Sequence, residues 1–416
     1  MIIHQPEIFE DDGDTILWSR IEFERPRDDF PQFLWYMVPT EHARHLSLHS
    51  DAFLLPGLLA GMHFGEEIEV RGAVSPLLAY QLDEYQYLLN FRMPKAVRPV
   101  RIKYSHLEPL SAHPKAVGTA FSGGVDSIFA LWRHTPGNQP IPGYRITHAL
   151  FIMGFDIVRK KEAKYRHLLY EYTNILKEID IELIPIETNI VRAIIPRMTL
   201  NQFYGPILAG CAHLFAVLFK RFYISSSRDY FNFRIRMSSS DPLADSLLSS
   251  DTLDLLHHGA THPRVEKIKE ISDWQFAHKN LRVCTTSNLE GNCSRCEKCV
   301  RTMIPLFALD KMTQFSTFKK PIKSNRDILL WARKFDPSNN YFPEMIPFIK
   351  QHKKELLPWL RLCYLLGTIR YQGIRLIPGV FKRFLSRFGY FIDSKLEQDA
   401  YENQEVIKLL RRRIEK

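Results

Sequence analysis

A short apolar run that leads into a glycine-rich loop, and then into a helical pattern, constrains this chain more than any other stretch. Residues 116–121 are apolar enough for a buried strand, and residues 127–132 begin an amphipathic helix. Between them the sequence is Ser122-Gly123-Gly124-Val125-Asp126-Ser127. Unpaired N–H groups and the positive end of the helix dipole meet at such a turn, so the pattern predicts a phosphate site.

The residue types in the loop suit a phosphate group. Gly123 and Gly124 have no Cβ atom, so the backbone can approach phosphate oxygens closely, and the hydroxyl groups of Ser122 and Ser127 are further donors. The loop contains no lysine, which separates it from the Walker A pattern. An ordinary Gly-Gly turn is the alternative. The flanking Ser, Asp and Ser residues favour the phosphate site.

The motif Ser-Gly-Gly-Val-Asp-Ser resembles the PP-loop of the ATP pyrophosphatase superfamily. Members of that superfamily split ATP between its α- and β-phosphates and transfer AMP to a substrate oxygen. The resemblance implies that this chain forms an adenylate and pyrophosphate with Mg²⁺, and that Ser122, Asp126 and Ser127 are catalytic. It also implies that ATP contacts Phe121, Ser122, Gly123, Gly124, Val125, Asp126 and Ser127.

The composition is that of an ordinary globular protein. With 416 residues, 45% of them hydrophobic, the chain can bury a large core, and its length predicts two or three domains. No basic region precedes an apolar run near Met1, and no apolar segment reaches the roughly 18 residues of a membrane span. We therefore expect neither a signal peptide nor a membrane span. The net charge of +10 permits a polyanionic partner such as RNA without requiring one.

Three segments are expected along the chain. Residues 1–112 predict a β-containing N-terminal domain, because short aromatic and β-branched runs such as residues 15–23 and 33–38 alternate with turns. Residues 113–320 alternate strand and helix patterns, which predicts an α/β fold whose parallel sheet has helices on both faces and ligands at the carboxyl ends of its strands. Residues 321–416 predict a basic helical region.

The middle segment is specific enough to place individual elements. It predicts strands at residues 116–121, 146–152, 181–186 and 222–224, with helices at 165–179 and 208–219. Residues 225–262 are rich in Ser, Asp and His, and we expect them to form a lid beside the site, with disorder as the alternative.

Further residues are expected at the same edge of the sheet. The superfamily places adenine against the end of the second strand, which implies backbone contacts from Phe151, Ile152 and Met153 and a ribose or metal contact from Asp156. A helix N-cap is the alternative for Asp156. Thr188 and Asn189 follow the third strand, and a turn role and a substrate role both stay open for them.

Two cations open a helical pattern after the expected lid. Arg264 and Lys267 could neutralise the leaving pyrophosphate. Surface charges on a helix are the alternative.

Four of the six cysteines lie close together in the sequence. Cys284, Cys293, Cys296 and Cys299 have the spacing C-x8-C-x2-C-x2-C, which can close a tetrahedral Cys₄ zinc site. An iron–sulfur cluster is the competing interpretation. The short span and the absence of proline after Cys299 favour zinc, in a structural role because no position is left for water. Such clustering also favours a reducing, cytoplasmic setting over a disulfide framework.

The PP-loop and the cysteine cluster together resemble the 7-cyano-7-deazaguanine synthase (QueC) family over about residues 114–310. That family adenylates 7-carboxy-7-deazaguanine, forms an amide with ammonia, and activates the amide again to give a nitrile. This chain departs from the family's substrate loop, because residues 227–232 match it only in fragments. It also has N-terminal and C-terminal regions that the simple synthase lacks.

The resemblance leaves the acceptor of the acyl group open. QueC-like proteins with such extensions occur in anti-phage defence gene clusters, which favours transfer to an amine of a partner protein. Synthesis of the free nitrile with ammonia is the first alternative, and a non-catalytic nucleotide-binding or RNA-binding module is the second. The C-terminal cations could form a surface for a polyanion or a membrane, or stay solvated on a packed helical region. The additional regions could equally serve oligomerisation.

Overall fold

The computed structural model describes residues 1–153, 155, 162–194, 198, 200–230, 239–284, 291–333, 341–376 and 406. They fall into two compact units. The first is built from Met1–Ser122 and Asp126–Thr261, and the second from the described residues of Gly123–Val125 and His262–Lys416.

An 11-stranded, mostly parallel sheet forms the centre of the first unit, which is therefore α/β. Its strand order is β11-β10-β7-β8-β9-β4-β3-β1-β5-β6, and β2 pairs with β3 beside this path. The strands are β1 (Ile2–Ile3), β2 (Glu7–Asp11), β3 (Asp14–Glu22), β4 (Phe33–Pro39), β5 (Ile68–Val74), β6 (Ile102–Leu107), β7 (Ala116–Ala120), β8 (His148–Met153), β9 (Glu182–Thr188), β10 (Phe219–Ser225) and β11 (Asp254–His258).

The five strands from β7 to β11 all pair in parallel. Their apolar runs suit a sheet that is covered on both faces, because parallel strands are buried by the helices that connect them. The connecting helices are α3 (Val125–Arg133), α4 (Glu162–Lys177), α5 (Ile190–Ile194) and α6 (Leu200–His213), and short 3-10 helices lie at Pro142–Tyr144 and Asp245–Leu248.

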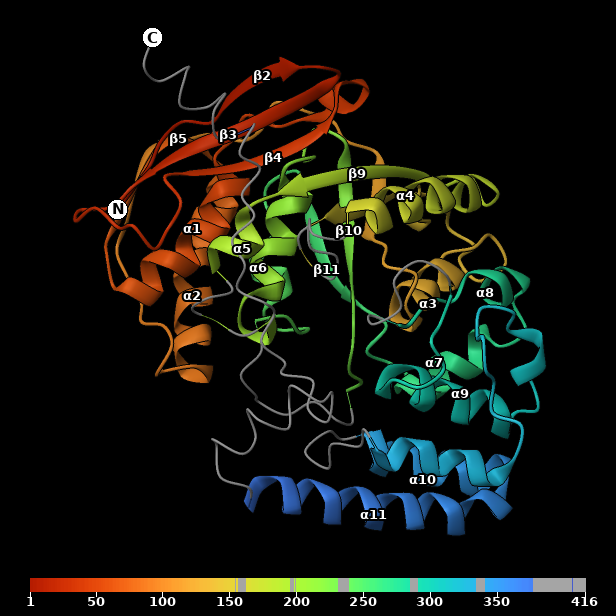
Figure 1. The fold of residues 1–416 in the computed structure, drawn as a ribbon. Helices are drawn as coiled ribbons and strands as arrows, with labels where there is room; N and C mark the ends of the chain where they lie inside the picture. Colours follow the sequence, from red (N-terminus) through yellow and green to blue (C-terminus); the bar gives the residue numbers. More distant parts are fainter. Residues whose placement is uncertain are drawn as a thin grey trace. The chain divides into compact units, whose positions relative to one another are not determined.

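The N-terminal strands extend the same sheet. Strand β4 pairs antiparallel with β3 and, through Tyr36 and Met37, with β9. Helix α1 (Asp51–Phe64) is apolar on nearly all sides and is buried accordingly, whereas α2 (Pro76–Arg92) buries one side. Helices α1 and α6 lie side by side, and their apolar residues belong to one continuous core (Figure 1). A further 3-10 helix spans Thr40–His45.

The second unit is helical. Helix α9 packs against α7 and α10, and α10 runs beside α11 (Figure 1). Its helices are α7 (Arg264–Ile271), α8 (Gln275–Asn280), α9 (Glu297–Ala308), α10 (Tyr341–His352) and α11 (Leu357–Leu376), with 3-10 helices at Met312–Gln314, Asn325–Arg333 and Lys354–Leu356. None of the helices in the described part of the chain is both long enough and apolar enough to cross a membrane.

The strands expected at residues 116–121, 146–152 and 181–186 are confirmed as β7, β8 and β9. Two expectations need correction. Helix α6 ends at His213 and β10 begins at Phe219, so the helix predicted at residues 208–219 extends too far. The expected lid contains a sheet strand, because β11 adds to the edge of β10.

The domain boundaries expected at residues 112/113 and 320/321 stay predictions. The compact units divide elsewhere, after Thr261 and around Gly123–Val125. Compact packing within one unit does not test whether a segment of it folds alone, so the two divisions answer different questions.

Candidate functional site

The glycine loop connects β7 to α3, which is the strand–loop–helix context that a phosphate site requires. The backbone of Gly123 has a positive φ of 73°, a conformation that favours glycine. Ser122 is exposed, whereas Ser127 is buried in the first helical turns. Asp126 lies in the first turn of α3 and is half-buried. The predicted catalytic residues therefore lie together on one short loop and helix start.

Contacts on both sides hold the loop. The peptide N–H of Phe121 donates to the Leu150 carbonyl at 2.9 Å, and its ring meets the ring of Tyr172 edge to face at 4.9 Å. The Tyr172 hydroxyl donates to the Ser122 carbonyl at 3.1 Å. Within the second unit, the peptide N–H of Arg282 donates to the Gly123 carbonyl at 2.7 Å. The loop backbone is thus positioned by neighbouring elements rather than by its own turn alone.

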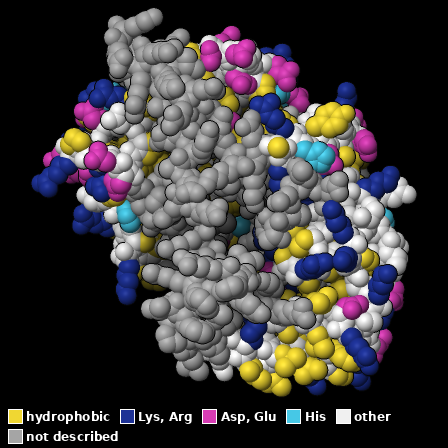
Figure 2. All heavy atoms as spheres, viewed as in Figure 1, with side chains coloured by type: hydrophobic (Ala, Val, Ile, Leu, Met, Phe, Trp, Pro, Cys, Tyr) yellow, Lys and Arg dark blue, Asp and Glu magenta, His cyan; other side chains and the backbone are white. Residues whose placement is uncertain are grey.

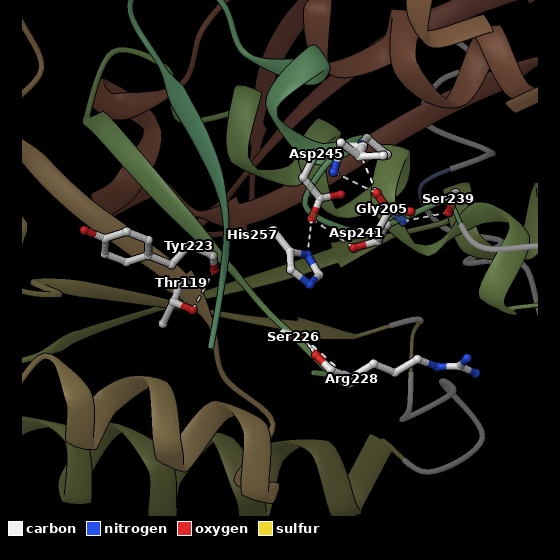
Figure 3. Close-up of polar contacts among 12 residues, drawn as sticks. Thr119, Gly205, Tyr223, Ser226, Arg228, Ser239, Asp241, Asp245 and His257 are labelled. Carbon is white, nitrogen blue, oxygen red and sulfur yellow. Dashed lines mark hydrogen bonds and ion pairs between the residues drawn. The ribbon is translucent and has the colours of Figure 1, made fainter. Parts of the chain in front are cut away.

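The strand order places the loop beside a topological switch point. From β7 the chain proceeds through β8 to β9 on one side, and then returns to β10 and β11 on the other side. In open α/β sheets, ligands bind outside the carboxyl ends of the two strands where the order reverses, here β7 and β10. Thr119 of β7 ties these strands together, because its hydroxyl donates to the Tyr223 carbonyl at 2.9 Å (Figure 3).

The segment that comes directly after β10 in the sequence lies beside the residues at the end of β11. The peptide N–H of Ser226 donates to the His258 carbonyl and that of Tyr230 to the Ala260 carbonyl, each at 2.8 Å. Ser226 also bonds to the backbone of Arg228, as Figure 3 shows, and Asp229 is buried. Of residues 227–232, which the sequence analysis compares with a substrate loop, residues 231 and 232 lie outside the described residues.

Residues expected from the second strand are only partly described. Ile152 is half-buried and Met153 is buried at the carboxyl end of β8. Phe155 packs edge to face against Tyr204 with 5.8 Å between ring centroids. Asp156 lies outside the described residues, so its expected ribose or metal contact stays a prediction.

Thr188 and Asn189 have a structural role at the end of β9. The Thr188 hydroxyl donates to the Trp35 carbonyl at 2.7 Å, and the Asn189 amide oxygen accepts from the peptide N–H of Trp35 at 3.1 Å. The Asn189 amide nitrogen donates to the Phe33 carbonyl at 2.8 Å. These bonds attach β4 to β9, whereas a substrate role for either residue stays a prediction.

The two predicted pyrophosphate cations lie on α7 in the second unit, the unit that also includes Gly123, Gly124 and Val125. The Lys267 side chain is only 1% exposed and Arg264 is half-buried. Lys267 is therefore not a solvated surface charge.

The four cysteines come together in the second unit. Their sulfur atoms all lie within 4.8 Å of one another, and Sγ–Sγ distances of 3.9 Å (Cys284–Cys296), 3.9 Å (Cys293–Cys299) and 3.3 Å (Cys296–Cys299) resemble the roughly 3.8 Å that a tetrahedron with Zn–S bonds of about 2.3 Å requires. The peptide N–H of Cys296 donates to the Cys293 sulfur. The four thiols can therefore hold a metal ion.

Asn292 supports the cluster from behind. Its amide oxygen accepts the N–H groups of Val283 and Cys284 at 2.8 and 3.1 Å. Gly291 precedes it with a φ of 59°, and a Cβ there would lie 2.6 Å from the Thr317 carbonyl oxygen. Hydrogen bonding with Cys284 raises the pKa of the Cys296 thiol to about 11, so a metal must displace thiol protons when it binds.

A buried polar cluster in the first unit was missed by the sequence analysis. His257 of β11 donates through Nδ1 to Asp245 Oδ2 at 2.7 Å, and the Ser240 hydroxyl donates to the same oxygen at 3.0 Å (Figure 3). Burial raises the pKa of Asp245 despite these bonds. Arg92 pairs with Asp241 beside them. A carboxylate that fixes an imidazole in this way can serve a general base or simply order a core.

No family model, curated protein or solved structure matches this chain. The features of this chain that bear on function are the loop, its place in the sheet and the cysteine cluster.

Proposed function

We propose that this chain is an ATP-dependent carbon–nitrogen ligase that adenylates a carboxylate and releases pyrophosphate. One observation carries the proposal: a Ser-Gly-Gly-Val-Asp-Ser loop without lysine connects β7 to α3 beside the sheet's switch point. Backbone N–H groups and a helix N-terminus suit phosphate oxygens. The loop's resemblance to the PP-loop selects cleavage between the α- and β-phosphates.

In the proposed first step, a carboxylate oxygen of the substrate attacks the α-phosphorus. The bond from the α-phosphorus to the bridging oxygen breaks, and pyrophosphate leaves with its electron pair. Ser122, Ser127 and the glycine N–H groups would bind phosphate oxygens, and the Asp126 carboxylate would hold Mg²⁺, which neutralises charge on the leaving group. The buried cation Lys267 and its neighbour Arg264 are candidates for the same task.

In the proposed second step, an amine attacks the acyl carbon and AMP leaves. AMP converts a poor oxygen leaving group into a good one, so the protein needs to supply orientation and a group that accepts the amine proton. The resemblance to the QueC family makes 7-carboxy-7-deazaguanine the first carboxylate to test.

We further propose that the amine belongs to a partner protein. The departure at residues 227–232, together with the additional N-terminal and C-terminal regions, supports a larger acceptor than ammonia. The four cysteines are proposed to hold a structural zinc ion, because a saturated Cys₄ site leaves no coordination position for water.

The test incubates the protein with ATP, Mg²⁺ and 7-carboxy-7-deazaguanine, with and without ammonia and with the products of neighbouring genes. Mass spectrometry then measures both small molecules and intact proteins. A protein that gains one deazaguanine acyl group establishes conjugation. Release of the nitrile with no mass added to any protein would reject conjugation and favour synthesis of the free nitrile. Nucleotide or tRNA binding without pyrophosphate release in any mixture would favour the non-catalytic module.

A further inference from the structure

Among its described residues, helix α11 (Leu357–Leu376) has one apolar face that is buried and a second that is exposed. The covered face includes Leu360 and Cys363, which are fully buried where α11 packs against the 3-10 helix Asn325–Arg333 and α10. The other face carries Leu362, Leu365, Leu366 and Ile369, which are 40%, 55%, 43% and 58% exposed. In Figure 2, hydrophobic side chains gather along the lower edge of the view, where Figure 1 places α11.

The four exposed side chains form one continuous stripe. They lie at positions i, i+3, i+4 and i+7, which face the same side of an α-helix. At about 100° per residue they fall within about 100° of arc, and Trp359 lies at one margin of that arc. Apolar residues in soluble proteins are often exposed singly, but an aligned group of this kind marks an interaction surface.

Positive charge borders the stripe. Counted around the helix axis from Leu362, Arg361 lies at roughly 100° on one side and Arg370 at roughly 80° on the other. Arg361 is exposed, and Arg370 is half-buried with its Nε–H donating to the Ala332 carbonyl at 3.1 Å. Helix α11 itself contains no acidic residue. The surface is therefore apolar at its centre and cationic at its margins.

This combination decides between the occupants that could cover the stripe. Four aliphatic side chains over about two turns cannot supply the roughly 800 Å² per partner that a stable dimer buries. A second copy would also bring cations against cations. An anionic lipid surface accepts a thin apolar stripe between its acyl chains and pairs its headgroups with the exposed Arg361, which can extend its guanidinium group toward them.

We propose that α11 docks this protein on the surface of a membrane that contains anionic phospholipid. The helix lies in the interface with Leu362, Leu365, Leu366 and Ile369 in the acyl boundary. The exposed Arg361 meets the headgroups. This proposal is independent of the ATP chemistry, since it rests on residues of α11 to which the proposed adenylation assigns no role.

The experiment measures sedimentation of the full-length protein with vesicles of phosphatidylcholine alone and with vesicles that also contain phosphatidylglycerol. We expect binding to the anionic vesicles at low salt, and weaker binding at high salt because salt screens the headgroup charge. The double variant L365S/I369S should bind at least about tenfold more weakly, because it lacks two large aliphatic side chains that the wild type transfers from water into the membrane.

A matched control removes the same residue types at the same exposure elsewhere. Leu243 and Ile141 are each 56% exposed in the first unit, so L243S/I141S should leave vesicle binding unchanged. For charge, Arg361→Gln should weaken binding to anionic vesicles about fivefold, whereas Arg101→Gln, at another exposed arginine, should not. Thermal unfolding of each variant shows that the fold is retained.

Absence of binding to anionic vesicles at low salt would overturn the proposal. Equal losses of vesicle binding in L365S/I369S and in L243S/I141S would also overturn the proposal, because binding would then not depend on the stripe. Sedimentation equilibrium of the same proteins tests the second copy: a dimer that L365S/I369S abolishes would assign the stripe to self-association in place of a membrane.

Discussion

His134 is buried just after α3 among aromatic rings. Its Nδ1–H donates to the Tyr144 carbonyl at 2.7 Å, its Nε2 lies 3.2 Å from that of His258, and its ring stacks on Tyr223 at 4.3 Å. Burial lowers its pKa to about 4, and the nearby Arg133 acts in the same direction. The folded protein therefore keeps this imidazole neutral at a pH at which the unfolded chain protonates it.

The free energy of unfolding should consequently fall as the pH drops from about 6.5 toward 4. In that window the unfolded state binds more protons than the folded state, so protons favour unfolding. The full shift corresponds to about 3 kcal/mol. Denaturant titrations of the wild type and His134→Gln should differ in their pH slope within this window. His106→Gln, which removes an exposed histidine, is the control. Parallel slopes for wild type and His134→Gln would contradict the account.

Cys296→Ser should remove the metal and destabilise the second unit. Three thiolates bind zinc less tightly than four, and a structural zinc ion contributes to folding directly. We expect about one zinc per chain in the wild type and a loss of Tm of roughly 5–10 °C in the variant. Elemental analysis and thermal unfolding measure both. Cys211→Ala, which removes a buried thiol outside the cluster, should keep the zinc. A brown protein that contains iron would instead assign an iron–sulfur cluster.

Among the elements, the pairing of β4 with β9 gives a prediction that separates a structural from a substrate role. Asn189→Ala removes both side-chain bonds to β4 and leaves the Trp35 N–H and the Phe33 carbonyl without that partner. The free energy of unfolding should fall by about 1–3 kcal/mol with the KM values for ATP and the carboxylate unchanged. Asn138→Ala, which loses exposed amide bonds, should cost about 0.5 kcal/mol or less. An unchanged stability with a raised KM would assign Asn189 to substrate.

The elements that sequence patterns predicted are those with local signals. Apolar runs identify β7, β8 and β9 because these strands lie in the middle of a covered parallel sheet. Strand β11 gave no such signal: its five residues alternate weakly, and of them only Leu255 is fully buried. The end of α6 was misplaced because residues 214–219 stay apolar after the helix stops. Periodicity does not separate a buried helix end from a buried strand start.

In the candidate site, too, only the residues that are contiguous in the sequence could be predicted from it. The glycine loop and the cysteine cluster are contiguous in sequence, so their residue types and spacing predict them. Asp245 and His257 belong to separate elements, and Arg92 pairs with Asp241 across a long stretch of chain. Only the folded sheet brings such residues together. The role of Thr188 and Asn189 likewise depends on β4, which precedes them by about 150 residues.

In the whole molecule, the residues to which we assign chemistry are divided between the two compact units. The first unit contains the switch point between β7 and β10, with the buried Asp245–His257 pair. The second contains the cysteine cluster, Lys267 and the exposed stripe of α11. Adenylation is the claim on which the account as a whole depends, because both the acceptor and the roles of the loop residues follow from it.

The most direct measurement of that claim identifies the products that the protein forms from ATP with Mg²⁺ and 7-carboxy-7-deazaguanine. We expect AMP and pyrophosphate in equal amounts. We also expect a loss of at least about 100-fold in turnover for Asp126→Ala, since that carboxylate is proposed to hold the metal that stabilises the leaving group. Asp83→Ala, at an exposed carboxylate on α2, should retain activity. ADP and phosphate as products, or full activity in a folded Asp126→Ala protein, would contradict the account.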